Sequence, residues 1–173
     1  MYRRSADCAL VLSGDLSPVN AMPCCSDLPL DARLDAAEAH CRDRGARLTR
    51  GRREVLRLLM QHDAGVKAYQ LLDELRALQG NVVAPPTVYR ALDFLQEMGL
   101  VHRLDSLNAF VACKADHGEH SLLLVCPQCG AVAETSAPGL GLTLMKALAH
   151  SGFVVQGDYL EIKALCPNCA KAR

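Results

Sequence analysis

The chain has 173 residues, half of them hydrophobic, which is enough for one domain or two small ones with a real core. Nineteen basic residues balance nineteen acidic residues, so the overall charge does not attract nucleic acid and any basic surface must be local. No apolar run approaches the roughly 20 residues that cross a bilayer, and the short run Ala9–Leu12 ends without a cleavage site, so we expect neither membrane insertion nor export.

Residues 1–30 show no helical or strand period. They carry scattered Ser, Gly, Pro and Asp together with three cysteines, Cys8, Cys24 and Cys25. Segments of this composition at a chain end are commonly unstructured, so we expect a flexible N-terminal tail with no assigned role.

Three short helices are expected next, each with one apolar face. Residues 31–44 are rich in helix formers and stop at Gly45. Thr49 is a plausible N-cap for a second helix that ends near His62, and a third helix covers residues 68–78. The inward positions are Val55, Leu58 and Leu59 with Leu56 at the margin, and then Leu71, Leu72 and Leu75.

The stretch Pro85–His102 predicts a fourth helix and the start of a hairpin. Two prolines open the helix, and Gly99 follows its last turn, where a left-handed cap favours glycine. Thr87, Tyr89 and Arg90 lie near the start, where a DNA-recognition helix contacts base edges. An amphipathic core helix is the alternative interpretation of the stretch. Its apolar face consists of Val88, Ala91, Leu92 and Leu95.

A hairpin completes the first domain. Two extended runs, Val101–Asp105 and Ala109–Cys113, are joined by a turn at residues 106–108. Helices followed by such a hairpin form a winged helix-turn-helix, and we expect this DNA-binding domain to cover residues 31–112.

Basic residues gather just before and within the second predicted helix. Six arginines occur within twelve positions and are opposed only by Asp43. Such a cluster suits contacts to DNA phosphates, which fix the register of a protein on the duplex without reading sequence. A solvated helix face is the alternative, but a neighbouring recognition helix favours DNA. The cluster consists of Arg42, Arg44, Arg47, Arg50, Arg52 and Arg53.

Residues 113–173 predict a small α/β unit, so the whole chain is expected to be α+β. At roughly sixty residues, a unit of this kind usually needs a metal or a partner chain for stability. We therefore expect it to be a dimerisation domain. Its elements are strands over His120–Cys126 and Ala131–Thr135, a helix over Leu140–Ser151, and strands over Phe153–Gln156 and Tyr159–Leu165.

Two Cys-x-x-Cys pairs predict a structural zinc site. The pairs are Cys126 with Cys129 and Cys166 with Cys169, and two such turns complete a tetrahedral thiolate site that ties the last strand to the central hairpin. A total of nine cysteines, an odd number, also fits metal thiolates in a reducing, cytoplasmic compartment better than a disulfide framework. A redox dithiol is the alternative. A closed four-thiolate site has no open position, which argues against an enzyme.

A second, more scattered group of residues offers nitrogen, sulfur and oxygen ligands that suit zinc. Solvated surface residues are the alternative interpretation of each member taken alone. The group consists of His102, Cys113, Asp116, His117, Glu119, His120 and Glu134.

The motifs together resemble the ferric uptake regulator family. The resemblance rests on Leu48-Thr49 with Arg52-Arg53, on Pro86–Leu92 followed by Gly99–His102, and on the two Cys-x-x-Cys pairs. The run Pro85–Leu95, with Ala68-Tyr69, is most similar to the zinc uptake branch. This resemblance implies a homodimeric, zinc-responsive repressor that binds palindromic operator DNA and controls zinc uptake genes, with no membrane and no small organic substrate.

The resemblance also assigns residues. It implies one structural zinc on the four cysteines and at least one regulatory zinc on His102, Cys113, one residue of the 117–120 loop, and Glu134. The loop is one residue shorter than expected, so His117, Glu119 and His120 compete; we choose His120, because a residue entering a strand is held more rigidly. Tyr69 and Arg90 match positions that touch bases. Together with Arg50, Thr87 and Tyr89, they form the predicted DNA-binding set.

Two alternatives remain open at this level. The family fold also serves sensors of other metals and of peroxide. A thiol redox or metal-transfer protein is a different class, which predicts cysteines that exchange rapidly with disulfides or a chelator, and it leaves the recognition helix without a purpose.

Overall fold

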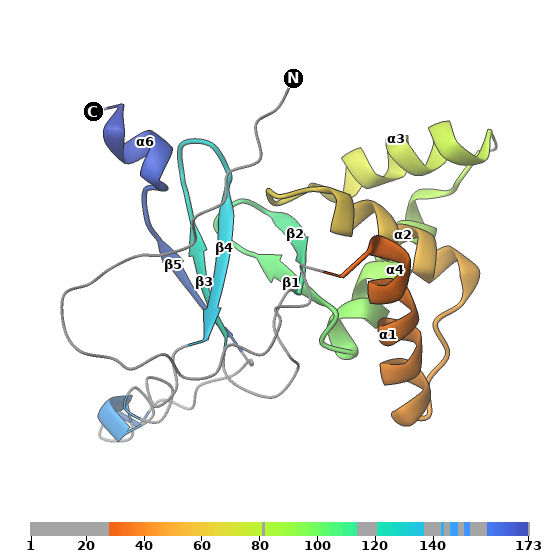
Figure 1. Cartoon of the computed structure of the whole chain (residues 1–173), viewed down its shortest axis with the longest axis horizontal. Helices are drawn as coiled ribbons and strands as arrows, with labels where there is room; N and C mark the ends of the chain where they lie inside the picture. The colour runs from red at the N-terminus through yellow and green to blue at the C-terminus, as the bar shows by residue number, and fades with distance from the viewer. Residues whose placement is uncertain are drawn as a thin grey trace.

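The computed structural model describes residues 28–80, 82–113, 121–136, 143, 146–148, 151–152 and 159–172. The N-terminal part consists of four helices, and the C-terminal part is built on strands (Figure 1). A two-stranded hairpin lies between the helices and a three-stranded sheet. This is the α+β arrangement expected from the sequence. None of the described helices is long and apolar enough to cross a bilayer.

The four helices begin and end close to the predicted positions. In the last of them the four predicted apolar positions are all buried, and Gly99 follows it with a φ of +69°, a conformation that favours glycine. Thr49 does occupy the N-cap of the second helix, but its side chain makes no capping hydrogen bond. The helices are α1 (Leu30–Asp43), α2 (Arg50–Gln61), α3 (Ala68–Gln79) and α4 (Pro85–Glu97).

Helix α2 is the central element of the helical part. It packs against α1, α3 and α4. The prediction that Leu56 lies at the margin of its buried face was wrong, because Leu56 is 0% exposed and fully inside the core. A helix with neighbours on several sides buries a wider arc than the single apolar stripe that helical periodicity describes.

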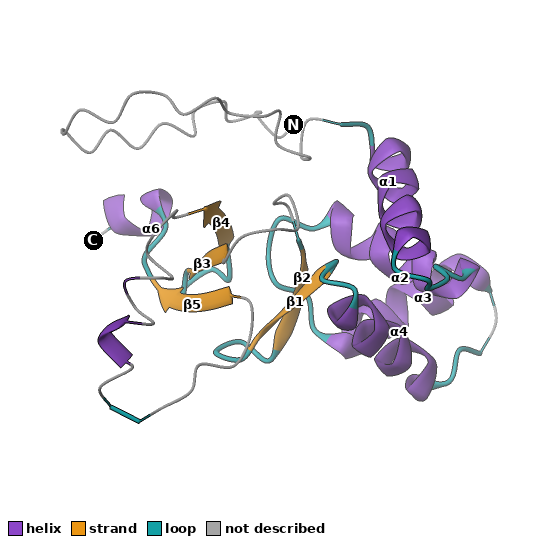
Figure 2. Cartoon of the chain, turned by 90° about the horizontal axis from the view of Figure 1, so that it is seen from below, coloured by secondary structure: helices purple, strands orange, loops and turns teal. Residues whose placement is uncertain are grey.

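The hairpin is a wing that is buried on both faces. Strands β1 (Val101–Leu104) and β2 (Ala109–Ala112) pair antiparallel, joined by a turn over residues 105–108. One face of the wing, which includes Val101 and Phe110, belongs to the helical core. The other face contributes Leu104 to a second apolar cluster with the C-terminal sheet. Figure 2 shows the hairpin between the two parts of the molecule.

The C-terminal sheet has the strand order β4–β3–β5. Strand β3 (Ser121–Val125) is central; it pairs antiparallel with β4 (Val132–Ser136), as predicted, and parallel with β5 (Tyr159–Lys163). Leu123 and Val125 are fully buried in the cluster under the wing. Because side chains alternate along a strand, the inner face of this sheet is the one that meets the wing.

The remaining predictions on the C-terminal part divide into two kinds. The expected helix over Leu140–Ser151 falls largely outside the described residues, and the expected strand over Phe153–Gln156 falls entirely outside them. A short helix, α6 (Pro167–Lys171), was not predicted. It begins at the second Cys-x-x-Cys pair, where a proline in the first turn favours helix geometry.

Gly65 makes a close approach beneath the wing that allows a sharp test of this packing. A Cβ at this position would lie 2.8 Å from Leu104 Cδ1 and 3.1 Å from Ala109 Cβ. Since Leu104 is fully buried and cannot swing aside, we expect Gly65→Ala to destabilise the protein by about 1–3 kcal/mol, the usual cost of overpacking. Urea unfolding measures this cost.

Gly51→Ala is the matched control, because a Cβ there meets no atom within 4 Å. In helix α2 this change is expected to be neutral or stabilising. Equal unfolding midpoints for the two variants would contradict the tight junction between the wing and the loop before α3.

Candidate metal centres and nucleic-acid interface

The first Cys-x-x-Cys pair forms a tight turn between β3 and β4. Cys126 follows β3, and its carbonyl accepts a hydrogen bond from the Gly130 amide at 2.9 Å. The Cys126 amide in turn donates to Ala131 O at 2.9 Å. Gly130 adopts a φ of +73°, which a residue without a side chain reaches at no steric cost. The Cys-Pro-Gln-Cys-Gly sequence therefore folds into a knuckle that directs both sulfurs to one side.

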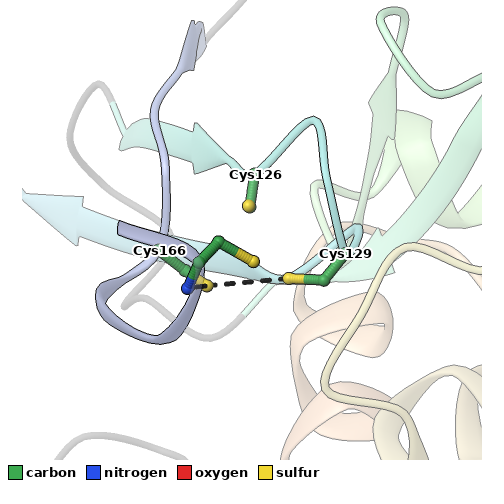
Figure 3. A group of neighbouring side chains, drawn as sticks. Cys126, Cys129 and Cys166 are labelled. Atoms are coloured by element: carbon green, nitrogen blue, oxygen red, sulfur yellow. Dashed lines mark hydrogen bonds between the residues drawn. The ribbon is translucent and has the colours of Figure 1, made fainter. Parts of the chain in front are cut away.

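The second pair follows β5 and opens helix α6. Cys166 is the N-cap of this helix, and its sulfur accepts the Cys169 amide at 3.5 Å. The Cys166 sulfur lies 3.6 Å from that of Cys129, and Figure 3 shows these two sulfurs and that of Cys126 pointing toward one another. All four sulfurs, including that of Cys169, lie within 4.8 Å of one another. A tetrahedral zinc thiolate needs sulfurs roughly 3.8 Å apart, so the cluster fits zinc.

The electrostatics of the cluster also favour a cation. Amides of Cys166 and Cys129 donate toward the Cys126 sulfur and lower its pKa to about 6, and the Cys169 amide lowers the pKa of Cys166. Hydrogen bonding from its own thiol to Cys166 raises the pKa of Cys169 to about 12. Because cysteine binds metal as the thiolate, a divalent cation at the centre of the four sulfurs would displace the thiol protons that remain.

A second cluster lies where the wing meets the sheet. It consists of His102 on β1, Cys113 just after β2, and Glu134 on β4, and their ligand atoms lie within 4.8 Å of one another. The Cys113 thiol donates to Glu134 Oε1 at 3.5 Å, and His102 Nε2 lies 3.4 Å from the same oxygen. The His102 and Glu134 side chains are only 9% and 6% exposed. The structure thus brings together three of the four residues predicted for the regulatory site.

His102 Nε2 makes this cluster a fit for a metal. Although Glu134 lies within ion-pair distance, Nε2 is buried and has no hydrogen-bond partner among the described residues. A buried nitrogen without a partner is costly, and a metal that also takes the sulfur and the carboxylate oxygen would satisfy it. The fourth predicted ligand, His120, and its competitors His117 and Glu119 lie outside the described residues.

The predicted DNA-binding residues are all exposed. Tyr69 on α3 is 58% exposed and Tyr89 on α4 is 52% exposed. Thr87, Arg90 and Arg50 are exposed as well. Residue Arg50 lines a hollow of about 620 Å³ between the start of α2 and the end of α3. The side chains expected to meet DNA are therefore accessible, as that role requires.

Part of the predicted arginine cluster is engaged inside the protein. Arg53 pairs with Asp35 at 2.6 Å and with Glu38 at 3.0 Å, which joins α2 to α1. The Arg52 guanidinium lies 3.5 Å above the ring of Phe94, a cation–π contact. These two arginines therefore also make contacts within the helical part, and the role of the cluster at phosphates stays a prediction.

Four helices followed by the β1–β2 hairpin form a winged-helix fold, and the proteins that this chain resembles are transcription regulators. The chain belongs to the ferric uptake regulator family, whose sequence model matches residues 43–163. The zinc uptake regulation protein of Escherichia coli K12 is 42% identical over 140 residues, which cover 80% of this chain and 81% of the relative. The family resemblance seen in the sequence, including its zinc uptake branch, is confirmed.

Two solved structures support the same grouping. One is a zinc uptake regulator in complex with zinc and DNA, which is 39% identical and superposes with a TM-score of 0.75 over 84% of this chain and 97% of its own. The other is holo XcZur, which is 40% identical with a TM-score of 0.72 over 82% and 99% of the two chains. Because the two matches cover 84% and 82% of this chain, the shared fold extends through both the helical part and the sheet.

Proposed function

We propose that the chain is a zinc-responsive repressor, which binds palindromic operator DNA as a homodimer when loaded with zinc and controls zinc uptake genes. The observation that carries this proposal is the convergence of His102, Cys113 and Glu134 from the wing and the sheet. The relatives named for zinc uptake regulation support the choice of metal. A thiolate ligand also favours zinc over iron or manganese.

The position of this cluster suggests how zinc acts. Two ligands belong to the wing side and one to the sheet, with His120 as the proposed fourth. A zinc bound to all four would therefore favour the arrangement in which the wing packs against the sheet, which we call the closed state. A ligand shifts a conformational equilibrium only through its differential affinity for the two states. The closed state would set the spacing of the two recognition helices in a dimer.

The sheet supports the proposed homodimer. Its outer face, opposite the wing, carries apolar side chains, and Ile162 among them is 44% exposed. Pairing of such a face with a second copy would bury it, and a two-fold dimer matches a palindromic site. We therefore keep the proposed division into a tail (1–30), a DNA-binding domain (31–112) and a dimerisation domain (113–173). The proposed structural zinc on the four cysteines would stabilise the dimerisation domain. We also propose that the protein acts in the cytoplasm.

Arg90 is proposed to read a base. Its exposed position near the start of α4 suits a bidentate contact to guanine O6 and N7, worth about 1–3 kcal/mol of discrimination. Replacing Arg90 with alanine is therefore expected to weaken operator binding by about 5–150-fold. Arg90→Lys keeps the charge but loses the planar fork, so it should retain salt-dependent non-specific binding and lose sequence preference. Competition between operator and scrambled duplexes measures both.

A zinc titration tests the proposed function directly. Anisotropy of a labelled duplex from upstream of the gene for this chain, and of one from a zinc-transporter promoter, is followed at buffered free zinc concentrations. Binding that rises with zinc, and at lower free metal than with iron, manganese or nickel, is the expected result. Tight binding without zinc, or a response to peroxide alone, would instead favour another sensor of the family.

The same samples separate the thiol-enzyme alternative. A structural site predicts that one zinc per chain survives a chelator that removes the regulatory zinc. Rapid loss of all zinc, together with disulfide exchange and no salt-dependent affinity for duplex DNA, would overturn the repressor proposal.

A further inference from the structure

Tyr159 contacts the wing at two consecutive residues. Its ring meets the ring of His102 edge-on, with centroids 4.8 Å apart and planes at 62°. Its hydroxyl donates a hydrogen bond of 2.6 Å to the carbonyl oxygen of Arg103. Sequence reasoning assigned no role to this tyrosine. One side chain at the start of β5 thus contacts both the imidazole of a proposed metal ligand and the backbone next to it.

These contacts restrict how the imidazole can turn. The Nε2 atom of His102 has no hydrogen-bond partner among the described residues, so no hydrogen bond at that atom fixes the ring. The edge-to-face contact with the Tyr159 ring restricts rotation of the imidazole instead. The hydroxyl, by holding the Arg103 carbonyl, fixes the backbone that carries the imidazole.

The same strand holds the far end of the wing. The Glu161 carboxylate accepts hydrogen bonds from the amides of Asp105 at 2.9 Å and Ser106 at 3.3 Å, both in the turn between β1 and β2. Tyr159 and Glu161 lie on the same face of β5, two residues apart. Strand β5 therefore secures the wing at its turn and beside His102 through contacts that need no metal.

We propose that Tyr159 is a positioning residue of the wing–sheet metal site, orienting the His102 imidazole so that Nε2 faces the Cys113 sulfur and the Glu134 carboxylate. This inference rests on the proposed metal-binding role of His102. Residues that orient a metal ligand typically change metal affinity 10–100-fold when replaced, and β5 acts here through an aromatic ring rather than through a hydrogen bond to the imidazole.

Graded variants of the full chain test the proposal, with zinc retained on the four cysteines. We expect Tyr159→Leu, which removes the ring and the hydroxyl, to weaken zinc binding at the second site by about 10–100-fold. Tyr159→Phe keeps the ring and should recover most of that affinity. The first readout is a competition titration with a zinc chelator. The second is the visible absorption of Co²⁺ added as the only other metal, whose bands report the ligand geometry at the wing–sheet site.

Leu107→Ala is the matched control. Leu107 packs against the same apolar cluster from the turn of the wing. Its loss therefore weakens the packing of the wing on the sheet without removing the Tyr159 ring beside His102. We expect this variant to keep the wild-type Co²⁺ spectrum. An unchanged affinity and spectrum in Tyr159→Leu would overturn the positioning role, as would an equal loss in Leu107→Ala.

A His102→Ala variant separates this inference from the proposed function. If wild type binds Co²⁺ at the second site and His102→Ala does not, the metal site stands, and the Tyr159 variants then decide the positioning role alone. If wild type and His102→Ala give the same Co²⁺ spectrum, the metal-binding role of His102 fails and the positioning inference fails with it.

Discussion

Cys166→Ser is expected to release the proposed structural zinc of the four-cysteine cluster and to unfold the C-terminal sheet. The Cys166 sulfur accepts the Cys169 amide and lies 3.6 Å from the Cys129 sulfur, so it belongs to both halves of the cluster. Structural zinc contributes about 10–16 kcal/mol in small zinc-binding peptides, and a unit of about sixty residues has little other stability. We expect the thermal midpoint to fall by at least about 10 °C, with one zinc per chain lost by elemental analysis.

The damage should spread from the cluster to the wing. The knuckle is joined to the loop before α3 by a β-bridge between Ala64 and Ala131 and by a hydrogen bond of 3.3 Å from the Gly65 amide to Gly130 O. Amide exchange near the Gly65 loop is therefore expected to quicken in the Cys166→Ser variant. The structural zinc would thus support the DNA-binding part as well as the sheet.

Cys41→Ala is the matched control for this prediction. Cys41 is a fully buried cysteine of α1 in the helical core, away from either ligand cluster. Its replacement costs some packing energy but should leave the zinc content unchanged. A Cys166→Ser protein that keeps a full, chelator-resistant zinc would contradict the four-thiolate assignment.

The helices could be predicted from sequence because the residues that set the ends and the buried face of each helix lie within or next to it. The prolines before Thr87 and the glycine at position 99 bound α4, and the apolar spacing between them gives its inner face. The burial of Leu56 could not be found in this way. It depends on how many helices surround α2, which local periodicity does not contain.

The wing was predicted as a hairpin but not as a strand pair buried on both sides. A signal was present, since Ala109–Ala112 is an uninterrupted apolar run of the kind that doubly buried strands carry. The contacts of β5 with the wing could not be predicted from the sequence. Alternation places Tyr159 and Glu161 on one face, but only the parallel pairing of β5 with β3 brings that face to the wing.

The arginine cluster and the Cys-x-x-Cys pairs differ in how much their spacing in the sequence reveals. The spacing of the arginines favoured phosphate contacts over a solvated helix face, and it gave no sign that Arg53 pairs with Asp35, 18 residues away. Pairings of that kind require the packing of α1 on α2. Cys-x-x-Cys spacing, by contrast, fixes two ligands within one turn, so only the meeting of the two pairs depended on the fold.

His102→Leu is expected to abolish zinc-dependent DNA binding without unfolding the protein. The substitution removes one proposed ligand, so we expect no zinc-dependent operator binding at free zinc up to about 100-fold above the wild-type half-maximal value, beyond the usual effect of losing an orienting residue. Since Nε2 is buried without a hydrogen-bond partner among the described residues, replacing the ring with an apolar side chain of similar size also removes a cost of about 1–3 kcal/mol. The metal-free protein should therefore be as stable as wild type or slightly more stable.

His62→Leu is the matched control, because His62 pairs with Glu74 at 3.1 Å in the helical part, outside both ligand clusters. It should keep the wild-type zinc response, whereas Cys113→Ser should lose it as His102→Leu does. Moving an equilibrium from 1:99 to 99:1 needs about 10⁴-fold differential affinity, so a site short of one ligand no longer drives closure even when zinc still binds. A wild-type zinc response in either His102→Leu or Cys113→Ser would locate the sensor elsewhere, whereas loss of folding in His102→Leu would make His102 a structural residue. The combination of retained stability and lost response is the result expected of a metal-site residue and not of a purely structural one.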